Sequence, residues 1–217
     1  MICLSAASLD VYSLCPRKFF YTYLAPDKLA VPLANYSKLG NQFHRLVEIL
    51  TPLPPSKRQP WLDRVDRQVG IWWQNFCRSG LDQVEGRVYS EYPVRWQYRG
   101  WELQARYDRL VITATGYAIW DWKTGKEKVS WQQSLYPLLW HWYTNTPPET
   151  ISLNFWYAPE SRIVSFAYNK QQQEEDQAKL DRVLDQLEEN QFPPTQDTSH
   201  CVDCFFRYHC WGRGEIA

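Results

Sequence analysis

The chain has 217 residues, which is enough for one domain of ordinary size with a substantial buried core. Its 24 basic side chains balance 24 acidic ones, so attraction to nucleic acid would need a local basic patch and not a net positive field. The sequence has neither an apolar run long enough to span a membrane nor an export signal at its start, so we expect a cytoplasmic protein with no membrane partner.

The first third of the chain is predicted to be helical. Apolar residues recur at helical spacing over residues 8–24, 38–50 and 61–78. The proline-rich segment 51–60 separates the second of these helices from the third and is predicted to be a loop.

The rest of the chain predicts a sheet flanked by further helices. Between residues 86 and 123 apolar and polar residues nearly alternate, with breaks at 98–100 and 115–116, so we expect three consecutive antiparallel strands. A helix, a strand pair and a polar helix with one apolar stripe follow, over residues 130–143, 151–157 with 163–168, and 171–190. The tail after them is predicted to be irregular. This order predicts an α/β fold with a mixed central sheet flanked by helices.

Two carboxylates and a lysine are predicted to meet at the end of the third strand. Side chains alternate along a strand, so Asp121 and Lys123 share one face while Trp122 points to the other. A hairpin that turns at 115–116 brings Asp108 of the preceding strand beside Asp121.

This grouping indicates hydrolysis of a phosphodiester. Neighbouring carboxylates repel each other, and a hard divalent cation relieves the repulsion while keeping positions open for water and phosphate. Lys123 would hold or deprotonate the attacking water. The alternative is that Asp121 and Lys123 are solvated charges at a strand end, because Asp-x-Lys is a short pattern with a high chance frequency.

Five segments, in the same order along the chain, resemble the RecB-like branch of the PD-(D/E)XK nucleases. They are an N-terminal box, a Gly-x-x-x-His helix, the segment of the first acidic ligand, the (D/E)-x-K strand and a Gln-x-x-x-Tyr helix. In this sequence they read SAASLDVYSLCPRKFFYTYL, LGNQFHRLVEIL, YDRL, AIWDWKTGK and, in the last helix, Gln132 with Tyr136. One departure is Ala105, where the family often has glycine three residues before the first aspartate.

The resemblance implies a restriction-endonuclease-like core and a set of site residues. His44, Asp108 and Asp121 would bind Mg²⁺ or Mn²⁺, and Lys123 would complete the hydrolytic group with Asp108 and Asp121. Gln132 and Tyr136 would lie near the active site and contact DNA. For His44 the alternative is a helix histidine satisfied by a neighbour, and for Gln132 and Tyr136 it is ordinary helix surface and core.

The cysteines indicate a second metal centre. Six cysteines in a reducing cytosol are not expected to form disulfides. Three of them lie close together in the tail, and a four-thiol site would need a fourth from elsewhere, for which the candidate is Cys15. The tail residues are Cys201, Cys204 and Cys210.

Members of the resembling subfamily, which includes AddB-type subunits and CRISPR-adaptation nucleases, hold a [4Fe-4S] cluster with such a set. The resemblance therefore implies one nuclease domain over 1–217, whose cluster region is formed by residues 1–24 together with 192–217. Structural Zn²⁺ is the alternative, with His200 or His209 replacing a thiol. Cys3 and Cys77 fall outside the pattern.

Taken together, these features predict a metal-dependent DNA nuclease, with exonuclease action on single-stranded or end-bearing DNA. Its setting would be DNA repair, recombination or the processing of foreign DNA, with a helicase or another repair or CRISPR-adaptation protein as partner. One alternative is a catalytically weak DNA-binding module of a larger complex. Another is an iron-sulfur protein that senses redox state or carries electrons.

Overall fold

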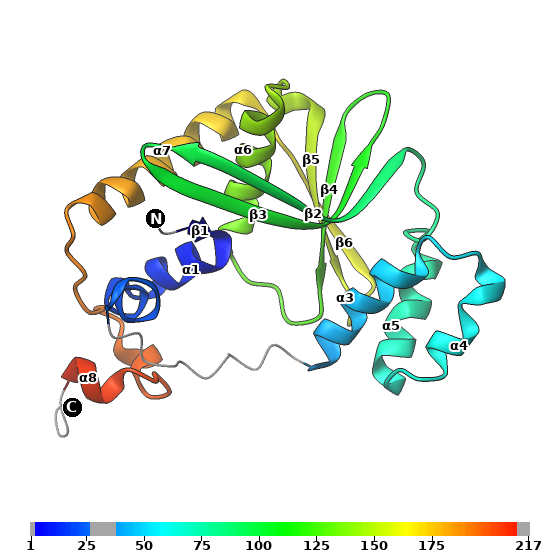
Figure 1. The fold of residues 1–217 in the computed structure, drawn as a ribbon, viewed down its shortest axis with the longest axis horizontal. Coiled ribbons are helices and arrows are strands. Elements are labelled where there is room, and N and C mark those ends of the chain that lie inside the picture. Colours follow the sequence, from blue (N-terminus) through cyan, green and yellow to red (C-terminus); the bar gives the residue numbers. More distant parts are fainter. Residues whose placement is uncertain (1–2, 27–37, 212–217) are drawn as a thin grey trace.

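The computed structural model describes residues 3–26 and 38–211. These residues form a mixed six-stranded sheet with helices on both faces (Figure 1). The strands are β1 (Cys3–Ser5), β2 (Arg87–Tyr98), β3 (Trp101–Ile112), β4 (Tyr117–Lys123), β5 (Ile151–Tyr157) and β6 (Arg162–Ala167). The α-helices are α1 (Ala6–Leu14), α2 (Pro16–Phe19), α3 (Lys38–Leu50), α4 (Gln59–Leu62), α5 (Arg67–Arg78), α6 (Gln132–Thr144), α7 (Lys170–Glu188) and α8 (Arg207–Trp211). Short segments of π-helix or 3-10 helix are η1 (Phe20–Leu24), η2 (Pro55–Lys57), η3 (Pro148–Thr150) and η4 (Thr198–Cys201).

The predicted α/β fold with a mixed sheet is confirmed. The meander β2–β3–β4 is antiparallel, and β5 pairs parallel with β4 and antiparallel with β6. A parallel pair needs a crossover connection, which α6 supplies between β4 and β5. The tight turn between β2 and β3 falls at Arg99 and Gly100, both with positive φ, as the break in the alternation predicted.

Two hydrophobic clusters cover the opposite faces of the sheet. On one face, side chains of α1, α6 and α7 pack against the sheet, with Leu9, Leu139 and Leu184 fully buried. On the other face, α3 and α5 pack against Trp122 and Trp156 of β4 and β5. β4 is therefore held between two cores, and its last residues, Asp121 to Lys123, line a cleft.

Several predicted boundaries are wrong at the N-terminal end. The helix expected over 8–24 is interrupted at Cys15, whose backbone is extended with φ −162°, because a residue before proline disfavours the helical region. The helix expected over 61–78 begins at Arg67, where the Asp66 side chain accepts from the Gln68 N–H. The predicted loop 51–60 contains η2 and the first residues of α4, and the irregular tail contains η4 and α8.

β1 was not predicted, because three residues are too few to show a strand period. It pairs parallel with β3, from Cys3 opposite Glu102 to Ser5 opposite Gln104. Its last residue, Ser5, caps α1 by accepting from the Ser8 N–H, so β1 sets where α1 begins.

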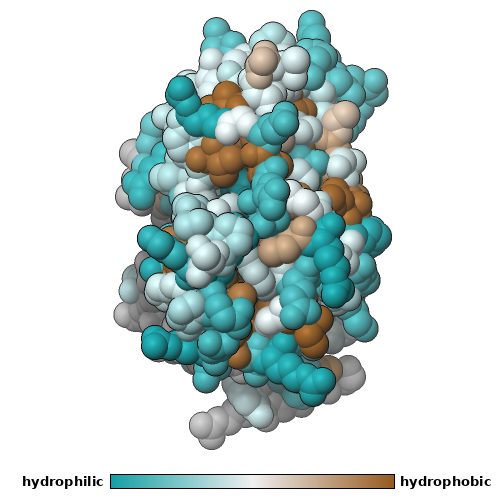
Figure 2. Space-filling view, turned by 90° about the vertical axis from the view of Figure 1, so that its right-hand side faces the viewer, coloured by the Kyte–Doolittle hydropathy of each residue, from teal (hydrophilic) through white to brown (hydrophobic). Residues whose placement is uncertain are grey.

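The surface is mostly hydrophilic on the face that Figure 2 shows, where apolar side chains form separate patches. Within the described parts of the chain, no helix combines the length and the apolar character needed to cross a membrane.

Candidate functional site

A large cleft lies where β3, β4, α3 and α6 meet. Its empty space is about 2280 Å³ and is open to solvent. All six residues that the sequence predicted for the nuclease site line this cleft, namely His44, Asp108, Asp121, Lys123, Gln132 and Tyr136. They come from four elements that are separated by as many as 92 positions, since His44 lies on α3 and Tyr136 on α6.

His44 and Asp108 form the first half of the site. The Nδ1 atom of His44 lies 3.2 Å from Oδ1 of Asp108, and its Nε2 atom lies 2.9 Å from the carbonyl oxygen of Trp122. The other oxygen of Asp108 accepts from the Trp122 N–H at 2.6 Å. Both side chains are thus oriented by the backbone of β4, one residue before Lys123.

The pKa of His44 reflects two opposing effects. Burial lowers it, but the hydrogen bond and charge of Asp108, together with the charge of Asp121 and the hydrogen bond to the Trp122 backbone, outweigh burial and raise the pKa from 6.5 to about 9. A metal at this position would therefore have to displace a proton from His44.

Asp121, Lys123 and Gln132 form the second half. The Lys123 ammonium lies 2.5 Å from Oδ2 of Asp121 and also donates to the Gln132 side-chain oxygen. The Gln132 amide donates to Oδ1 of Asp121 at 2.7 Å and to the hydroxyl of Tyr136 at 2.9 Å. Burial and the neighbouring charge of Asp108 raise the pKa of Asp121 to about 6.

This second half links the strand end to the first turn of α6. Gln132 and Tyr136 are four positions apart and so lie on one face of the helix. Gln132 uses both ends of its amide here, which holds the Lys123 side chain in one place over the Phe155 ring, 4.6 Å from its centroid.

One acidic residue of the site was missed by the sequence analysis. Oxygen or nitrogen atoms of His44, Glu91 and Asp108 lie within 4.8 Å of one another, and this is the one group of three potential metal ligands among residues 3–26 and 38–211. Asp121 lies beside it but engages Lys123 and Gln132 instead. The hairpin register could have indicated Glu91, because it falls between residues paired with Arg109 and Tyr107 and so lies opposite Asp108.

The donor atoms suit a hard divalent cation. One imidazole nitrogen with carboxylate oxygens is a set that Mg²⁺ and Mn²⁺ accept, whereas no thiol lines the cleft among its described residues. His44 and Asp108 would hold such an ion, with Asp121 next to it.

Basic side chains surround this acidic centre. Beyond Lys123, the cleft is lined by Arg95 and Arg106 from the β2–β3 hairpin and by Lys126 and Lys128 from the loop after β4. A chain with no net charge thus places five basic side chains along one groove, where they can contact phosphate groups.

Comparison with known proteins agrees with this geometry. The model of the family described as the PD-(D/E)XK nuclease superfamily matches residues 3–211. The chain belongs to the PD-(D/E)XK nuclease superfamily. No curated protein matches the sequence.

Solved structures resemble this superfamily member over nearly its whole length. A candidate exonuclease from Eubacterium rectale matches with a TM-score of 0.56 and 9% identity, over 98% of this chain and 88% of the other. The crystal structure of SSO0001 matches with a TM-score of 0.46 and 13% identity, over 96% of this chain and 85% of the other. At 9% identity, the match to the Eubacterium rectale structure shows a shared fold alone.

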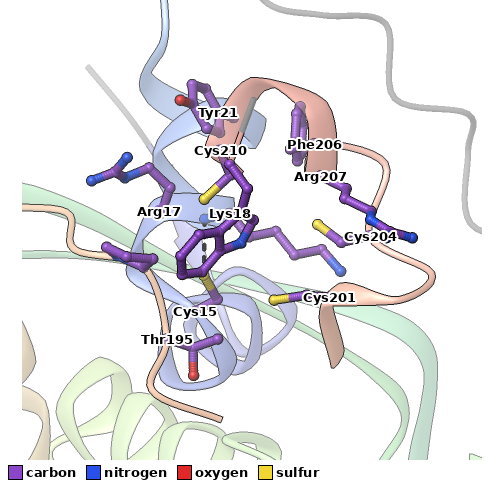
Figure 3. A pocket seen from close by; sticks show the side chains of 12 residues that line it. Cys15, Arg17, Lys18, Tyr21, Thr195, Cys201, Cys204, Phe206, Arg207 and Cys210 are labelled. Carbon is purple, nitrogen blue, oxygen red and sulfur yellow. Dashed lines mark hydrogen bonds between the residues drawn. The ribbon is translucent and has the colours of Figure 1, made fainter. Parts of the chain in front are cut away.

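The four cysteines predicted as cluster ligands line a second pocket of this superfamily member. Figure 3 shows Cys15 from the start of α2 facing the three tail residues across the pocket, whose empty volume is about 310 Å³. The tail residues are Cys201, Cys204 and Cys210, and none of the four is in a disulfide. Neither His200 nor His209 lines the pocket.

The tail is joined to the N-terminal helices beside this pocket. Arg17 donates from its backbone N–H to the carbonyl of Pro193 at 3.1 Å and from Nε to the carbonyl of Phe192 at 2.9 Å. The ring of Tyr21 stacks on Phe206 with centroids 5.2 Å apart. The segment around α2 and the tail thus meet at the cysteines.

The two remaining cysteines lie elsewhere. Burial raises the pKa of Cys3 to about 12 and that of Cys77 to about 11, so both stay protonated at neutral pH. Neither lines the pocket of the other four.

Proposed function

We propose that this protein is a Mg²⁺- or Mn²⁺-dependent nuclease that hydrolyses phosphodiester bonds in DNA. The observation that carries the proposal is the position of Lys123, held by Asp121 and Gln132 at the end of β4, beside the pair His44–Asp108 in a cleft lined by basic side chains. Binding a phosphodiester at this point requires positive charge around a metal-ligating centre, and the cleft offers both.

The roles of the residues follow from their contacts. When bound, the metal would act as a Lewis acid on the phosphate and lower the pKa of water. Lys123, whose side-chain nitrogen is held by Asp121 and Gln132, orients the attacking water as an ammonium, and would accept the proton of that water only in its neutral amine form. Asp121 fixes the Lys123 side chain by its ion pair. Gln132, which bonds to Tyr136, also bonds to Lys123 and Asp121 and so keeps both side chains in this orientation. Arg95, Arg106, Lys126 and Lys128 bind flanking phosphates without reading bases.

The substrate that we propose is DNA that is single-stranded or has free ends, cut as an exonuclease would cut it, in repair, recombination or foreign-DNA processing. A helicase or another repair or CRISPR-adaptation protein is the proposed partner. These finer assignments rest on the motif resemblance of the sequence. The digestion products distinguish exonuclease from endonuclease action and single-stranded from double-stranded substrates.

The test is digestion of end-labelled single- and double-stranded DNA and RNA with Mg²⁺, Mn²⁺ or chelator. Wild type should release short products from DNA in a metal-dependent reaction, whereas Lys123→Ala and Asp121→Ala should bind DNA without cutting it. Lys170→Ala is the matched control, since that lysine is exposed, forms an ion pair with Glu174 at 3.9 Å and does not line the cleft. A wild-type protein that binds DNA but never cuts it would show a DNA-binding module instead.

We further propose that Cys15, Cys201, Cys204 and Cys210 hold a [4Fe-4S] cluster. Four thiolates around one zinc ion lie about 3.8 Å apart, given Zn–S bonds of about 2.3 Å. No three of these sulfurs lie within 4.8 Å of one another. A single zinc ion would therefore require these sulfurs to move closer together, and Arg17, Lys18 and Arg207 on the pocket wall offset thiolate charge.

Metal analysis distinguishes an iron-sulfur cluster from zinc at the four cysteines. Anaerobically purified protein should contain about four iron atoms per chain and show broad absorption near 400 nm, as cysteine-ligated iron-sulfur clusters do. About one zinc and no iron would leave the four ligands in place but refute the cluster.

A further inference from the structure

Glu91 has an unusual backbone for the middle of a strand. Its φ is +52°, although it is not glycine, and it interrupts the β2–β3 ladder between the pairs Ser90–Arg109 and Tyr92–Tyr107. A left-handed conformation is costly for a residue with a Cβ atom, and such strain concentrates at functional sites. The interruption falls directly opposite Asp108.

The distortion coincides with a potential ligand position. Donor atoms of Glu91, His44 and Asp108 lie within 4.8 Å of one another and come from β2, α3 and β3. Ligands of Mg²⁺ lie about 2.1 Å from the ion, and therefore about 3 to 4 Å from one another. The three side chains need only a small contraction to reach that arrangement.

Arg106 forms an ion pair with Glu91, the carboxylate that a bound metal would contact. Arg106 places its Nε atom 3.0 Å from Oε2 of Glu91, yet the Arg106 side chain is 72% exposed while that of Glu91 is 28% exposed. Arg106 also lines the DNA cleft. An exposed guanidinium can leave this carboxylate at little cost, because exposed ion pairs contribute little.

We propose that Glu91 is a ligand of the catalytic metal together with His44 and Asp108, and that the metal displaces Arg106, which then binds a phosphate of the DNA. This inference rests on the proposed function for its second half, and its first half concerns metal binding alone. Asp121 keeps its contacts with Lys123 and Gln132 beside this group.

The test measures Mn²⁺ affinity without DNA, from the electron paramagnetic resonance of free Mn²⁺. Glu91→Gln should weaken binding at least tenfold, the order seen when a metal site loses a supporting group. Arg106→Gln should bind Mn²⁺ a few-fold more tightly and DNA more weakly. Glu48→Gln is the control for charge, because the charge of Glu48 acts on Glu91 from outside the ligand group.

A second substitution separates ligation from charge and guards against misfolding. Glu91→Asp keeps the charge but shortens the side chain, so it should also lose affinity while its thermal melt stays cooperative. Unchanged Mn²⁺ binding in both Glu91 variants, or an equal loss in Glu48→Gln, would overturn the proposal.

The same proteins separate this inference from the proposed function. If wild type digests DNA and Glu91→Gln binds Mn²⁺ normally, the nuclease stands and the ligand assignment falls. If Glu91→Gln loses Mn²⁺ but wild type never cuts DNA, the metal site stands and the nuclease falls, together with the role of Arg106 toward DNA.

Discussion

The replacement Asp10→Ala tests whether α1 controls the geometry of the active site. Asp10 lies on α1 and accepts from the Trp131 N–H at 2.7 Å and from the Ser130 hydroxyl at 2.8 Å. Its carboxylate, 120 positions earlier in the chain, thus holds the two residues that immediately precede α6, whose first residue is Gln132. Its removal leaves the N-terminus of α6 without this negative partner.

The expected loss follows from these two bonds. Replacing a capping side chain by alanine costs about 0.5–2 kcal/mol, and bonds to a charged acceptor lie at the upper end. We expect about 2 kcal/mol for Asp10→Ala, which lowers Tm by about 4–8 °C in a chain of this size. Because Gln132 would shift with the first turn of α6, kcat should also fall by about 10- to 100-fold, with KM for DNA nearly unchanged.

The assay compares Tm with kcat, the latter measured well below the melting transition. Asp66→Ala is the matched control, because Asp66 caps α5 by a single bond to the Gln68 N–H at 2.8 Å, away from the cleft. It should lose about 1 kcal/mol of stability and keep its kcat. Wild-type kcat in Asp10→Ala, despite the expected loss of stability, would refute a positioning role for α1.

Three further outcomes follow from the structure. The pKa of His44 is about 9 in the folded protein and 6.5 in the unfolded chain, so protonated His44 stabilises the metal-free fold. This contribution is fully present below pH 6.5 and is lost as the pH rises through about 9. Between pH 7 and 9 the Tm of the metal-free wild type should therefore fall further than the Tm of His44→Gln. An equal fall of Tm in the two proteins would contradict the pairing of His44 with Asp108. Glu91→Gly removes the cost of a positive φ, about 1–2 kcal/mol. Its Tm should therefore equal or exceed that of wild type, even though its Mn²⁺ affinity falls. A lower Tm would show that the backbone at Glu91 is not strained. Cys15→Ser should match Cys204→Ser in lost absorbance near 400 nm and in lost stability, and a coloured, stable Cys15→Ser protein would refute the four-ligand cluster.

Local periodicity was enough to predict the parts of the site that depend on neighbours in the chain. Asp121 and Lys123 share a face because strand side chains alternate, and their ion pair at 2.5 Å follows from that. Gln132 and Tyr136 meet because helix positions four apart are neighbours, and their hydrogen bond is 2.9 Å long. Breaks in the alternation predicted the turns of the meander, and with them the position of Asp108 beside β4.

Tertiary structure alone decided the contacts between distant segments. The sequence by itself gives no sign that Glu91 adopts a left-handed backbone opposite Asp108, since that conformation depends on the pairing of β2 with β3. Likewise Asp10 reaches Trp131 only because α1 packs beside α6, and Cys15 faces the tail only because the helix breaks before Pro16. Periodicity reports which face a side chain takes within its own element, whereas the site is assembled from different elements whose packing brings those faces together.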